Sequence, residues 1–287
     1  MKYVTTAELS DVIRRNLWKI PRDIDFVIGV PRSGMIPASI IACFLNVPLI
    51  DINSYIAGMP PSGGSRLQYY EANHKTYGRA LVVDDTVWKG TAMREAKNKL
   101  ADIKDMQFVY MCVFMEGRGE HLVDLYLADL RMFTNEYRNI VTYEWNIFQH
   151  HEKFMRRCLY DIDGVLCLEP PDERNEKVYL RYIAHATPLF LPRAKIGGII
   201  TYRLAKNKEI TEKWLRDNGV NYGELIMFDA SSWEQRRDAG ISPATYKARY
   251  YASHDYRLFV ESDDCQAQEI ARLSGKPVLC VSTNKMY

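Results

Sequence analysis

Short runs of aliphatic residues, bounded by glycine, aspartate and proline, alternate along the chain with longer stretches in which apolar residues recur every three or four positions. The short runs predict buried strands at residues 25–30, 79–85 and 107–114. Between them, residues 35–46 and 91–103 have the length and periodicity of helices. Strands that alternate with helices predict parallel sheets with helices on both faces.

The same alternation returns after a polar, basic and aromatic stretch at residues 142–157. We therefore predict an α/β protein of two Rossmann-like domains with mainly parallel sheets, and we place the division near residue 155, which gives domains 1–155 and 156–287. In the second half, we expect strands at 156–165, 195–203, 224–229, 257–262 and 276–282, and helices at 207–219 and 264–275, both of which end on a glycine suited to a C-cap.

The composition is that of a globular protein, with 47% hydrophobic and 26% charged residues among 287. A net charge of +2 is too small to indicate nucleic acid or an anionic membrane as a partner, although loops can still bind a small anionic substrate. The six cysteines include no C-x-x-C pair, which favours free thiols in a reducing compartment. Because no apolar run is long enough to span a membrane and no apolar signal core is visible, we expect a cytoplasmic protein without a membrane span.

Two adjacent acids, Asp84 and Asp85, end the predicted strand at 79–85, and the sequence TVWKGTAM then turns into the next helix. In open α/β sheets, ligands bind beyond the carboxyl ends of the strands. A glycine-bearing turn that leads into a helix offers backbone N–H groups to a phosphate. The two carboxylates suit sugar hydroxyls or a magnesium-bound polyol beside it. Phosphate next to hydroxyls indicates a ribose phosphate.

The sequence VVDDTVWKGTAM resembles the signature of the type I phosphoribosyltransferases (PRTases), which holds the ribose 5-phosphate of phosphoribosyl pyrophosphate (PRPP). The resemblance implies that Asp84 and Asp85 contact the ribose. The turn departs from the family at Lys89, where Thr or Ser is usual, and at Ala92, where Thr is usual. Backbone amides can still bind phosphate, and Lys89 could supply charge to it. The residues of the turn implied in PRPP binding are Thr86, Lys89, Gly90 and Thr91.

A second loop, VIGVPRSGMIPA at residues 27–38, resembles the pyrophosphate loop of the same family. The resemblance implies that Arg32, Ser33 and Gly34 bind PRPP, with the arginine and nearby amides on the leaving pyrophosphate. A guanidinium group suits this task because it makes bidentate contacts and keeps its charge.

Members of this family usually carry a mobile loop where this chain has residues 53–78, and closure of such a loop excludes water from the reacting centre. Tyr69, Tyr70 and Lys75 are interpreted as solvated residues of that loop that could reach substrate on closure.

The family often stacks the base on an aromatic residue from the C-terminal part of the domain. Trp145 and Phe148 are the candidates for base binding here. The alternative is that both rings belong to a core or to a domain interface.

A second acid pair, Asp161 and Asp163 in CLYDIDGVL, lies at another predicted strand end. One carboxylate can attack phosphorus while the other, two residues on, protonates the leaving oxygen, and magnesium would overcome their repulsion of a phosphate. The stretch resembles the D-x-D-G signature of the haloacid dehalogenase-like (HAD) phosphohydrolases.

Further parts of that family follow in order along the chain. The resemblance implies that Thr201 hydrogen-bonds the phosphoryl group and that Lys247 stabilises it, with Lys206, Lys208 and Arg249 as alternatives to the lysine. Among the acids of RLFVESDD, spacing favours Glu261 and Asp264 over Asp263 as metal ligands beside Asp161 and Asp163. Only 40 positions separate Asp161 from Thr201 and 46 separate Thr201 from Lys247, which leaves no room for a large cap domain, so closure is expected from the first domain or another subunit.

Together the resemblances imply consecutive chemistry with PRPP, a nitrogenous base, a phosphomonoester and Mg²⁺. The first domain would make a nucleoside 5′-monophosphate, and the second would remove its phosphate through an aspartyl-phosphate intermediate. One alternative is a phosphatase regulated by a PRTase-like module that only binds PRPP or a nucleotide. Another is a phosphatase for an unrelated phosphosugar. The acceptor base cannot be inferred, and a homodimer is possible because PRTases commonly dimerise.

Overall fold

The computed structural model describes residues 1–64, 78–133, 140–170 and 175–287. The loop residues Tyr69, Tyr70 and Lys75 lie outside the described residues. The chain forms two compact units that divide between Trp145 and Asn146. Residues 146–155, which we expected in the first domain, cluster with the second unit, where the short helix α6 (Glu152–Met155) contacts the sheet.

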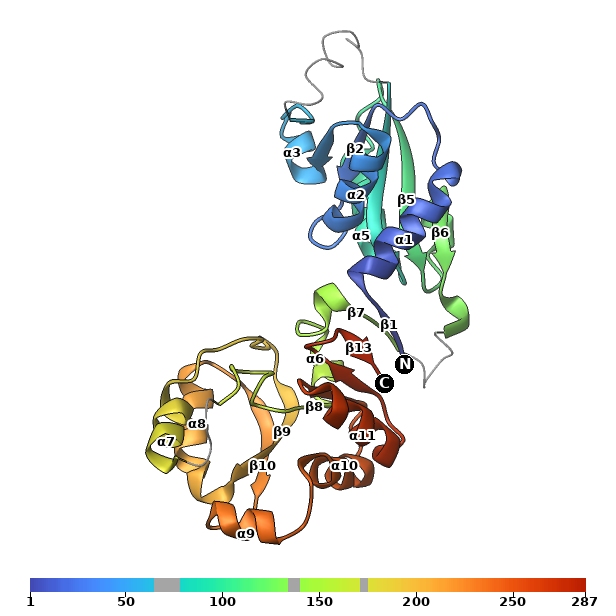
Figure 1. Ribbon diagram of the computed structural model, residues 1–287. Coiled ribbons are helices and arrows are strands. Elements are labelled where there is room, and N and C mark those ends of the chain that lie inside the picture. The colour runs from blue at the N-terminus through green and yellow to red at the C-terminus, as the bar shows by residue number, and fades with distance from the viewer. Residues whose placement is uncertain (65–77, 134–139, 171–174) are drawn as a thin grey trace. The chain divides into compact units, whose positions relative to one another are not determined.

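Unit 1 is built on a sheet of five parallel strands in the order β3-β2-β4-β5-β6 (Figure 1). A separate parallel pair, β1 and β7, joins the two ends of the unit. The strands are β1 (Lys2–Val4), β2 (Phe26–Gly29), β3 (Leu49–Asp51), β4 (Arg79–Val87), β5 (Gln107–Met115), β6 (Leu125–Asp129) and β7 (Val141–Tyr143). The main helices are α1 (Thr6–Asn16), α2 (Met35–Leu45), α3 (Ile52–Ile56) and α5 (Thr91–Leu100), and short 3-10 turns span Leu17–Lys19, Glu120–Leu122, Arg131–Phe133 and Glu144–Asn146.

The two faces of this sheet are buried under different helices because the side chains of a strand alternate between its faces. Leu81 and Val83 of β4 pack with α1 and α2, whereas Ala80 and Val82 pack with α3 and α5. All four side chains are fully buried, as the uninterrupted aliphatic run of this strand predicts for a central parallel strand.

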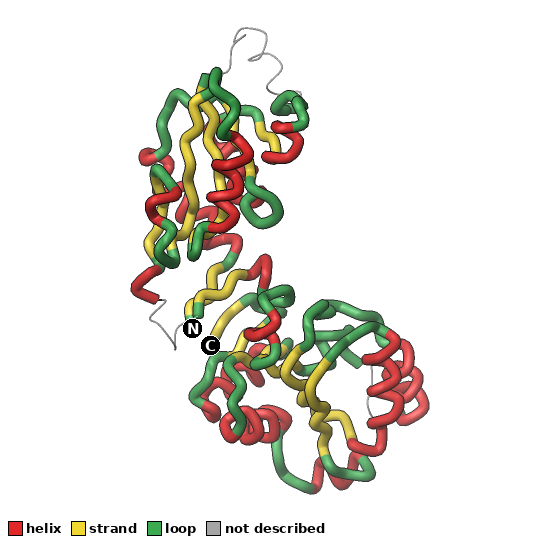
Figure 2. Tube along the Cα trace, turned by 180° about the vertical axis from the view of Figure 1, so that it is seen from behind, coloured by secondary structure: helices red, strands yellow, loops and turns green. Residues whose placement is uncertain are grey.

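Unit 2 has a six-stranded sheet in the order β10-β9-β8-β11-β12-β13, parallel except for β13 at its edge. Helices lie on both sides of its strands, with α7 and α8 on one side and α10 and α11 on the other (Figures 1 and 2). The strands are β8 (Cys158–Tyr160), β9 (Ile196–Leu204), β10 (Tyr222–Phe228), β11 (Leu258–Glu261), β12 (Val278–Cys280) and β13 (Lys285–Met286). The helices that follow α6 are α7 (Glu176–His185), α8 (Lys208–Asp217), α9 (Trp233–Asp238), α10 (Pro243–Ser253) and α11 (Asp264–Ser274), with a 3-10 turn at Ala205–Asn207.

Local sequence sets the ends of the helices beside the second sheet. Ser242 caps α10 by accepting the N–H of Thr245, and Asp263 caps α11 by accepting the N–H of Gln266. Gly275 ends α11 with a φ of 67°, the left-handed conformation that glycine adopts without strain. Within the described part of the chain, no helix has the length and apolar character needed to cross a membrane.

Two candidate active sites

The candidate site of unit 1 lies where β2 ends, beside Val83 of β4. The chain leaves β2 for β3 on one side and returns to β4 on the other, so the strand order reverses between β2 and β4. The N–H of Val30 donates to the carbonyl of Val83 at 2.9 Å, which joins the loop after β2 to the end of β4. A reversal of this kind opens the crevice in which α/β sheets bind ligands.

The acid pair lies in the last part of β4, and Asp84 and Asp85 each expose 6% of their surface. The N–H of Asp85 donates to Asp84 Oδ1 at 2.9 Å, and the N–H of Thr86 donates to Asp85 Oδ1 at 2.9 Å. Burial and the negative charge of Asp85 raise the pKa of Asp84 well above its usual range. A ligand that brings hydroxyl donors or a cation would relieve this concentration of negative charge.

The loop that carries Arg32 lies directly against the acid pair. Arg32 is exposed, Ser33 is half-buried and Gly34 is buried. A Cβ atom at Gly34 would lie 2.8 Å from the carbonyl oxygen of Val83 and 2.9 Å from Asp84 Oδ1, so only glycine allows the approach. The structure therefore brings together the two motifs that the sequence separates by about fifty residues.

The predicted phosphate turn leads into α5. Gly90 has a φ of 70°, and the first turn of α5 has no side-chain cap. Lys89 and Thr91 are exposed, and the ammonium group of Lys89 lies 5.1 Å from the centre of the Trp88 ring. Because the first N–H groups of a helix have no partner within it, this end of α5 can donate to an anion.

The two aromatic candidates for base binding lie in different units. Trp145 packs against Tyr143 with ring centres 4.8 Å apart, and its Nε1–H donates to Asp85 Oδ2 at 2.7 Å. Phe148 belongs to unit 2, where it stacks on Phe190 at 5.0 Å. This differs from the expected place of Phe148 beside a base of the first domain, because the chain passes into the second unit before it reaches that residue.

Sequence reasoning missed Glu116, which directly follows β5. Its carboxylate accepts a hydrogen bond from the hydroxyl of Tyr143. Burial raises the pKa of Glu116 to about 7, with the hydrogen bond from Tyr143 opposing and the charge of Asp85 adding to the rise. The available signal was position, since an acid that follows the strand next to β4 ends at the same edge of a parallel sheet.

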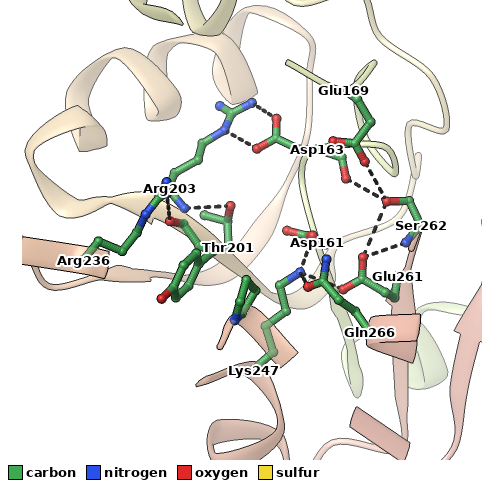
Figure 3. Close-up of a pocket in the computed structure, with 12 residues that line it drawn as sticks. Asp161, Asp163, Glu169, Thr201, Arg203, Arg236, Lys247, Glu261, Ser262 and Gln266 are labelled. Carbon is green, nitrogen blue, oxygen red and sulfur yellow. Dashed lines mark hydrogen bonds and ion pairs between the residues drawn. The ribbon is translucent and has the colours of Figure 1, made fainter. Parts of the chain in front are cut away.

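The candidate site of unit 2 is a cavity of about 220 Å³ at the point where β8 and β11 end beside each other (Figure 3). The strand order reverses here too, because the chain runs from β8 through β9 and β10 before it returns to β11. The lining residues are Asp161, Asp163, Glu169, Thr201, Tyr202, Arg203, Arg236, Pro243, Lys247, Glu261, Ser262 and Gln266.

Lys247, on α10, is the central cation of this cavity and exposes only 2% of its surface. Its Nζ donates to Asp161 Oδ2 at 2.6 Å, to Glu261 Oε2 at 2.7 Å and to Gln266 Oε1 at 3.1 Å (Figure 3). Burial raises the pKa of Asp161 to about 7, although the charge of Lys247 opposes the rise. The attraction of the two carboxylates outweighs burial and raises the pKa of Lys247.

Asp163 is held by a different cation, the guanidinium of Arg203. Arg203 donates from Nε to Oδ2 at 3.0 Å and from Nη2 to Oδ1 at 2.5 Å (Figure 3). The hydroxyl of Tyr182 also donates to Oδ1 of Asp163, at 2.7 Å. Burial alone would raise the pKa of Asp163, but the charge and hydrogen bonds of Arg203 outweigh it and hold the pKa below its usual range. Among the described residues, Arg203 Nη1 has no hydrogen-bond partner.

The remaining predicted residues divide between the cavity and the surface. Thr201 is 1% exposed in the second half of β9, and its hydroxyl accepts the N–H of Arg203 at 3.3 Å. Asp264, which we predicted as a metal ligand, does not line the cavity. As the first residue of α11, it directs its carboxylate to the hydroxyls of Thr283, at 2.8 Å, and Tyr287.

Three cavity residues that sequence reasoning missed connect the acid motifs. The hydroxyl of Ser262 donates to the carbonyl of Asp163 at 3.2 Å and to Glu169 Oε1 at 3.0 Å. The place of Arg203 could have been predicted from the sequence. Residues two apart on a strand share a face, and Arg203 follows Thr201 by two. Glu169 gave no such signal, because its place depends on the turn after Gly164, which has a φ of 73°.

Comparisons with known proteins concern mainly the first half of the chain. Residues 3–147 match the sequence model of the phosphoribosyl transferase domain. Two curated relatives are xanthine-guanine phosphoribosyltransferases, from Chromohalobacter salexigens (32% identity over 39% of this chain and 65% of the relative) and Idiomarina loihiensis (27% identity over 44% of this chain and 73% of the relative). The chain thus spans just under two thirds of the first relative's length.

Solved structures that resemble this chain include the orotate phosphoribosyltransferase from Aeropyrum pernix, at 22% identity with a TM-score of 0.33, which covers 44% of this chain and 71% of that one. They also include the purine phosphoribosyltransferase from Pyrococcus horikoshii Ot3, at 20% identity with a TM-score of 0.35, which covers 50% of this chain and 92% of that one. Because the family model matches half of the chain, from residue 3 to residue 147, the protein belongs to the phosphoribosyl transferase domain family.

Proposed function

We propose that unit 1 transfers the phosphoribosyl group of PRPP to a nitrogenous base, and that unit 2 removes the 5′-phosphate from the nucleotide so formed. The first step is supported by one arrangement, in which the buried acid pair and the Arg32 loop meet at the switch point of a parallel sheet in a chain of this family. The names of the two curated relatives support a purine of the xanthine or guanine type as the acceptor.

In the transfer step, Asp84 and Asp85 would accept hydrogen bonds from the ribose hydroxyls, and the N-terminus of α5 would bind the 5-phosphate. Arg32 would bind the pyrophosphate. A ring nitrogen of the base attacks C1 of the ribose, the bond from C1 to the pyrophosphate oxygen breaks, and the pyrophosphate leaves with the electron pair. The acid pair offers the hard oxygen ligands that suit Mg²⁺ carried by PRPP, and that ion would neutralise charge on the leaving group.

In the second step, Asp161 would attack the phosphorus of the monophosphate and form an aspartyl phosphate that water hydrolyses. The bond from phosphorus to the 5′-oxygen breaks, and that oxygen takes a proton from solvent water to leave as the nucleoside hydroxyl. Lys247 would hold the nucleophile and stabilise phosphoryl charge, and Thr201 would hydrogen-bond the phosphoryl oxygens. The support is the cavity itself, which gathers five residues matching the HAD pattern from separate strands and helices.

The pair of Asp163 and Arg203 sets a condition on this chemistry. An aspartate acts as a general acid only when protonated, and the bidentate ion pair keeps Asp163 charged. A charged carboxylate suits the later half of the reaction, in which it takes a proton from the water that attacks the aspartyl phosphate. We therefore assign Asp163 first to this general-base role.

Unit 2 offers two carboxylates that fit Mg²⁺. Among the described residues, no three His, Cys, Asp or Glu side chains gather into a metal cluster. Asp161 and Glu261 both lie in the cavity, and Mg²⁺ is commonly held by one or two carboxylates, with water and substrate phosphate completing its shell. These two residues would hold the ion, which would offset the charge of the phosphate. Asp163, also predicted as a ligand, is paired with Arg203, and Asp264 does not line the cavity, so neither is proposed.

A base screen with PRPP and Mg²⁺, which measures nucleotide, nucleoside, pyrophosphate and phosphate together, tests both steps. Changing Asp84 and Asp85 to Asn should stop consumption of PRPP. Changing Asp161 to Asn should make the 5′-monophosphate accumulate, whereas the control Asp264→Asn should leave phosphate release intact. If the Asp161 change leaves the products unaltered, the tandem scheme is refuted.

The same screen separates a binding module from an enzyme. Lys89 and Ala92 replace the hydroxyl side chains usual in the phosphate turn, and the Lys89 ammonium lies over the Trp88 ring. A unit 1 that only sensed PRPP would bind it without releasing pyrophosphate with any base. Release of pyrophosphate would exclude that alternative.

A further inference from the structure

Two aromatic residues at the end of unit 1 contact acids at the ends of two neighbouring strands. Tyr143 bonds Glu116, which follows β5, and Trp145 bonds Asp85, near the end of β4. The two rings pack against each other at 4.8 Å with an angle of 36° between their planes. These four side chains form a continuous row of contacts that ends on one member of the acid pair, Asp85.

Trp145 completes the fixation of Asp85. Asp85 Oδ1 accepts the N–H of Thr86 at 2.9 Å, and Oδ2 accepts the indole N–H at 2.7 Å. Both carboxylate oxygens of Asp85 therefore accept a hydrogen bond, and the residue is buried, with 6% of its surface exposed. A bond from a neutral donor to a carboxylate is among the stronger hydrogen bonds, and it stabilises the charge without cancelling it.

The indole of Trp145 has one partner on its ring and another at its edge. Its ring packs on Tyr143, itself 4% exposed and in contact with Phe114 at 5.8 Å. The ring edge that carries the N–H points to Asp85. The indole thus has a rigid support on its ring and a defined partner at its edge, which is the arrangement that holds another side chain in place.

We propose that Trp145 is a positioning residue for PRPP, which fixes the orientation of the Asp85 carboxylate so that the acid pair can receive the ribose hydroxyls. This inference rests on the proposed function of unit 1 and deepens it. It assigns Trp145 to the sugar half of the site, through Asp85, rather than to the base. Tyr143 contributes indirectly, because its ring packs against the indole and holds it in place.

Titration of PRPP with Mg²⁺ into the full chain, followed by calorimetry, tests the proposal without knowledge of the base. Trp145→Phe keeps an aromatic ring but loses the N–H, so it should weaken PRPP binding about ten- to hundredfold, the value of one hydrogen bond to a charged group. The matched control is Trp18→Phe, which alters a tryptophan that is 78% exposed in the same unit and should leave binding unchanged.

The outcomes separate this inference from the proposed function. If the unaltered chain does not bind PRPP, both are overturned. If it binds PRPP and Trp145→Phe binds it within threefold as well, the inference alone is overturned. If Trp145→Phe raises KM for the base and leaves the affinity for PRPP unchanged, Trp145 stacks the base and the positioning role is wrong.

A second measurement does not depend on how that variant folds. The full chain is labelled with 5-fluorotryptophan and observed by fluorine NMR. The resonance of Trp145 is the one that persists when each of the other four tryptophans is changed to Phe. Addition of PRPP and Mg²⁺ should shift this signal, and Asp85→Asn should shift it before any ligand is added. A Trp145 signal that is insensitive to both would overturn the proposal.

Discussion

Replacement of Lys247 by Met tests the electrostatic account of the cavity in unit 2. The change keeps most of the side-chain volume and removes the ammonium group that bonds Asp161 and Glu261 at 2.6 and 2.7 Å. Two buried carboxylates would then lack their cation. Removal of one partner from a buried ion pair costs about 3–5 kcal/mol. We therefore expect the free energy of unfolding of unit 2 to fall by that amount near pH 8.

The loss should depend on pH in a defined direction. Lys247 has a raised pKa, so it stays charged throughout the range from pH 5 to 9 and contributes no pH dependence there. Asp161 has a pKa of about 7 in the folded chain and about 3.9 when unfolded, so it is protonated in the native state at pH 5.5 and charged at pH 8. The cost of losing Lys247 should therefore be greatest at pH 8 and smaller at pH 5.5.

Hydrogen exchange of peptides from β8 and β11, followed by mass spectrometry, reports the stability of this unit separately from that of unit 1. The control is Lys206→Met, which breaks an exposed pair with Glu176 and should cost at most about 1 kcal/mol. Adding Glu261→Gln to Lys247→Met should restore part of the stability at pH 8. A loss below about 1 kcal/mol, or an equal loss at pH 5.5 and 8, would refute the reasoning.

Three further outcomes are expected. Asp84→Asn removes a buried charge beside Asp85, so it should stabilise unit 1 by roughly 1–2 kcal/mol near pH 8, as measured by denaturant unfolding. The same change should weaken PRPP binding, as measured by calorimetry. Gly164→Ala should lower phosphate release at least tenfold, since its Cβ would lie 2.2 Å from two side-chain oxygens at a φ of 73°, and unchanged turnover of a phenyl phosphate would contradict this. Arg203→Met should raise the pKa of Asp163 and leave less of it charged, so that the aspartyl phosphate is hydrolysed more slowly and accumulates after rapid mixing with substrate; decay of the aspartyl phosphate at the original rate would remove Asp163 as the general base.

The sequence predicts both candidate sites at strand ends because parallel strands share an edge at their carboxyl ends. Once apolar runs identified the strands, the acids after them had to gather, as Asp84 and Asp161 show in their units. The helices predicted at 91–103 and 264–275 are confirmed, with bounds of Thr91–Leu100 and Asp264–Ser274.

Side-chain direction could not be predicted in the same way. Asp264 was predicted as a metal ligand but does not line the cavity. The boundary between β11 and α11 decides which acid points inward, and the spacing of the acids in the sequence does not show that boundary. The partner of Trp145 lies 60 residues earlier in the chain, and no local pattern reveals such a bond. Pairing of Asp163 with Arg203 was equally hidden, since it joins residues 40 apart.

The ladder between β1 and β7 has a consequence for engineering. Lys2 pairs with Val141 and Val4 with Tyr143, and Glu144 accepts the backbone N–H of Thr6, so the two ends of unit 1 are fastened together. A module whose ends adjoin can be inserted as a cassette into a surface loop of a host protein, or reopened elsewhere as a circular permutant, with little strain on either. The same fastening means that trimming a few N-terminal residues would free the strand that leads directly to Trp145.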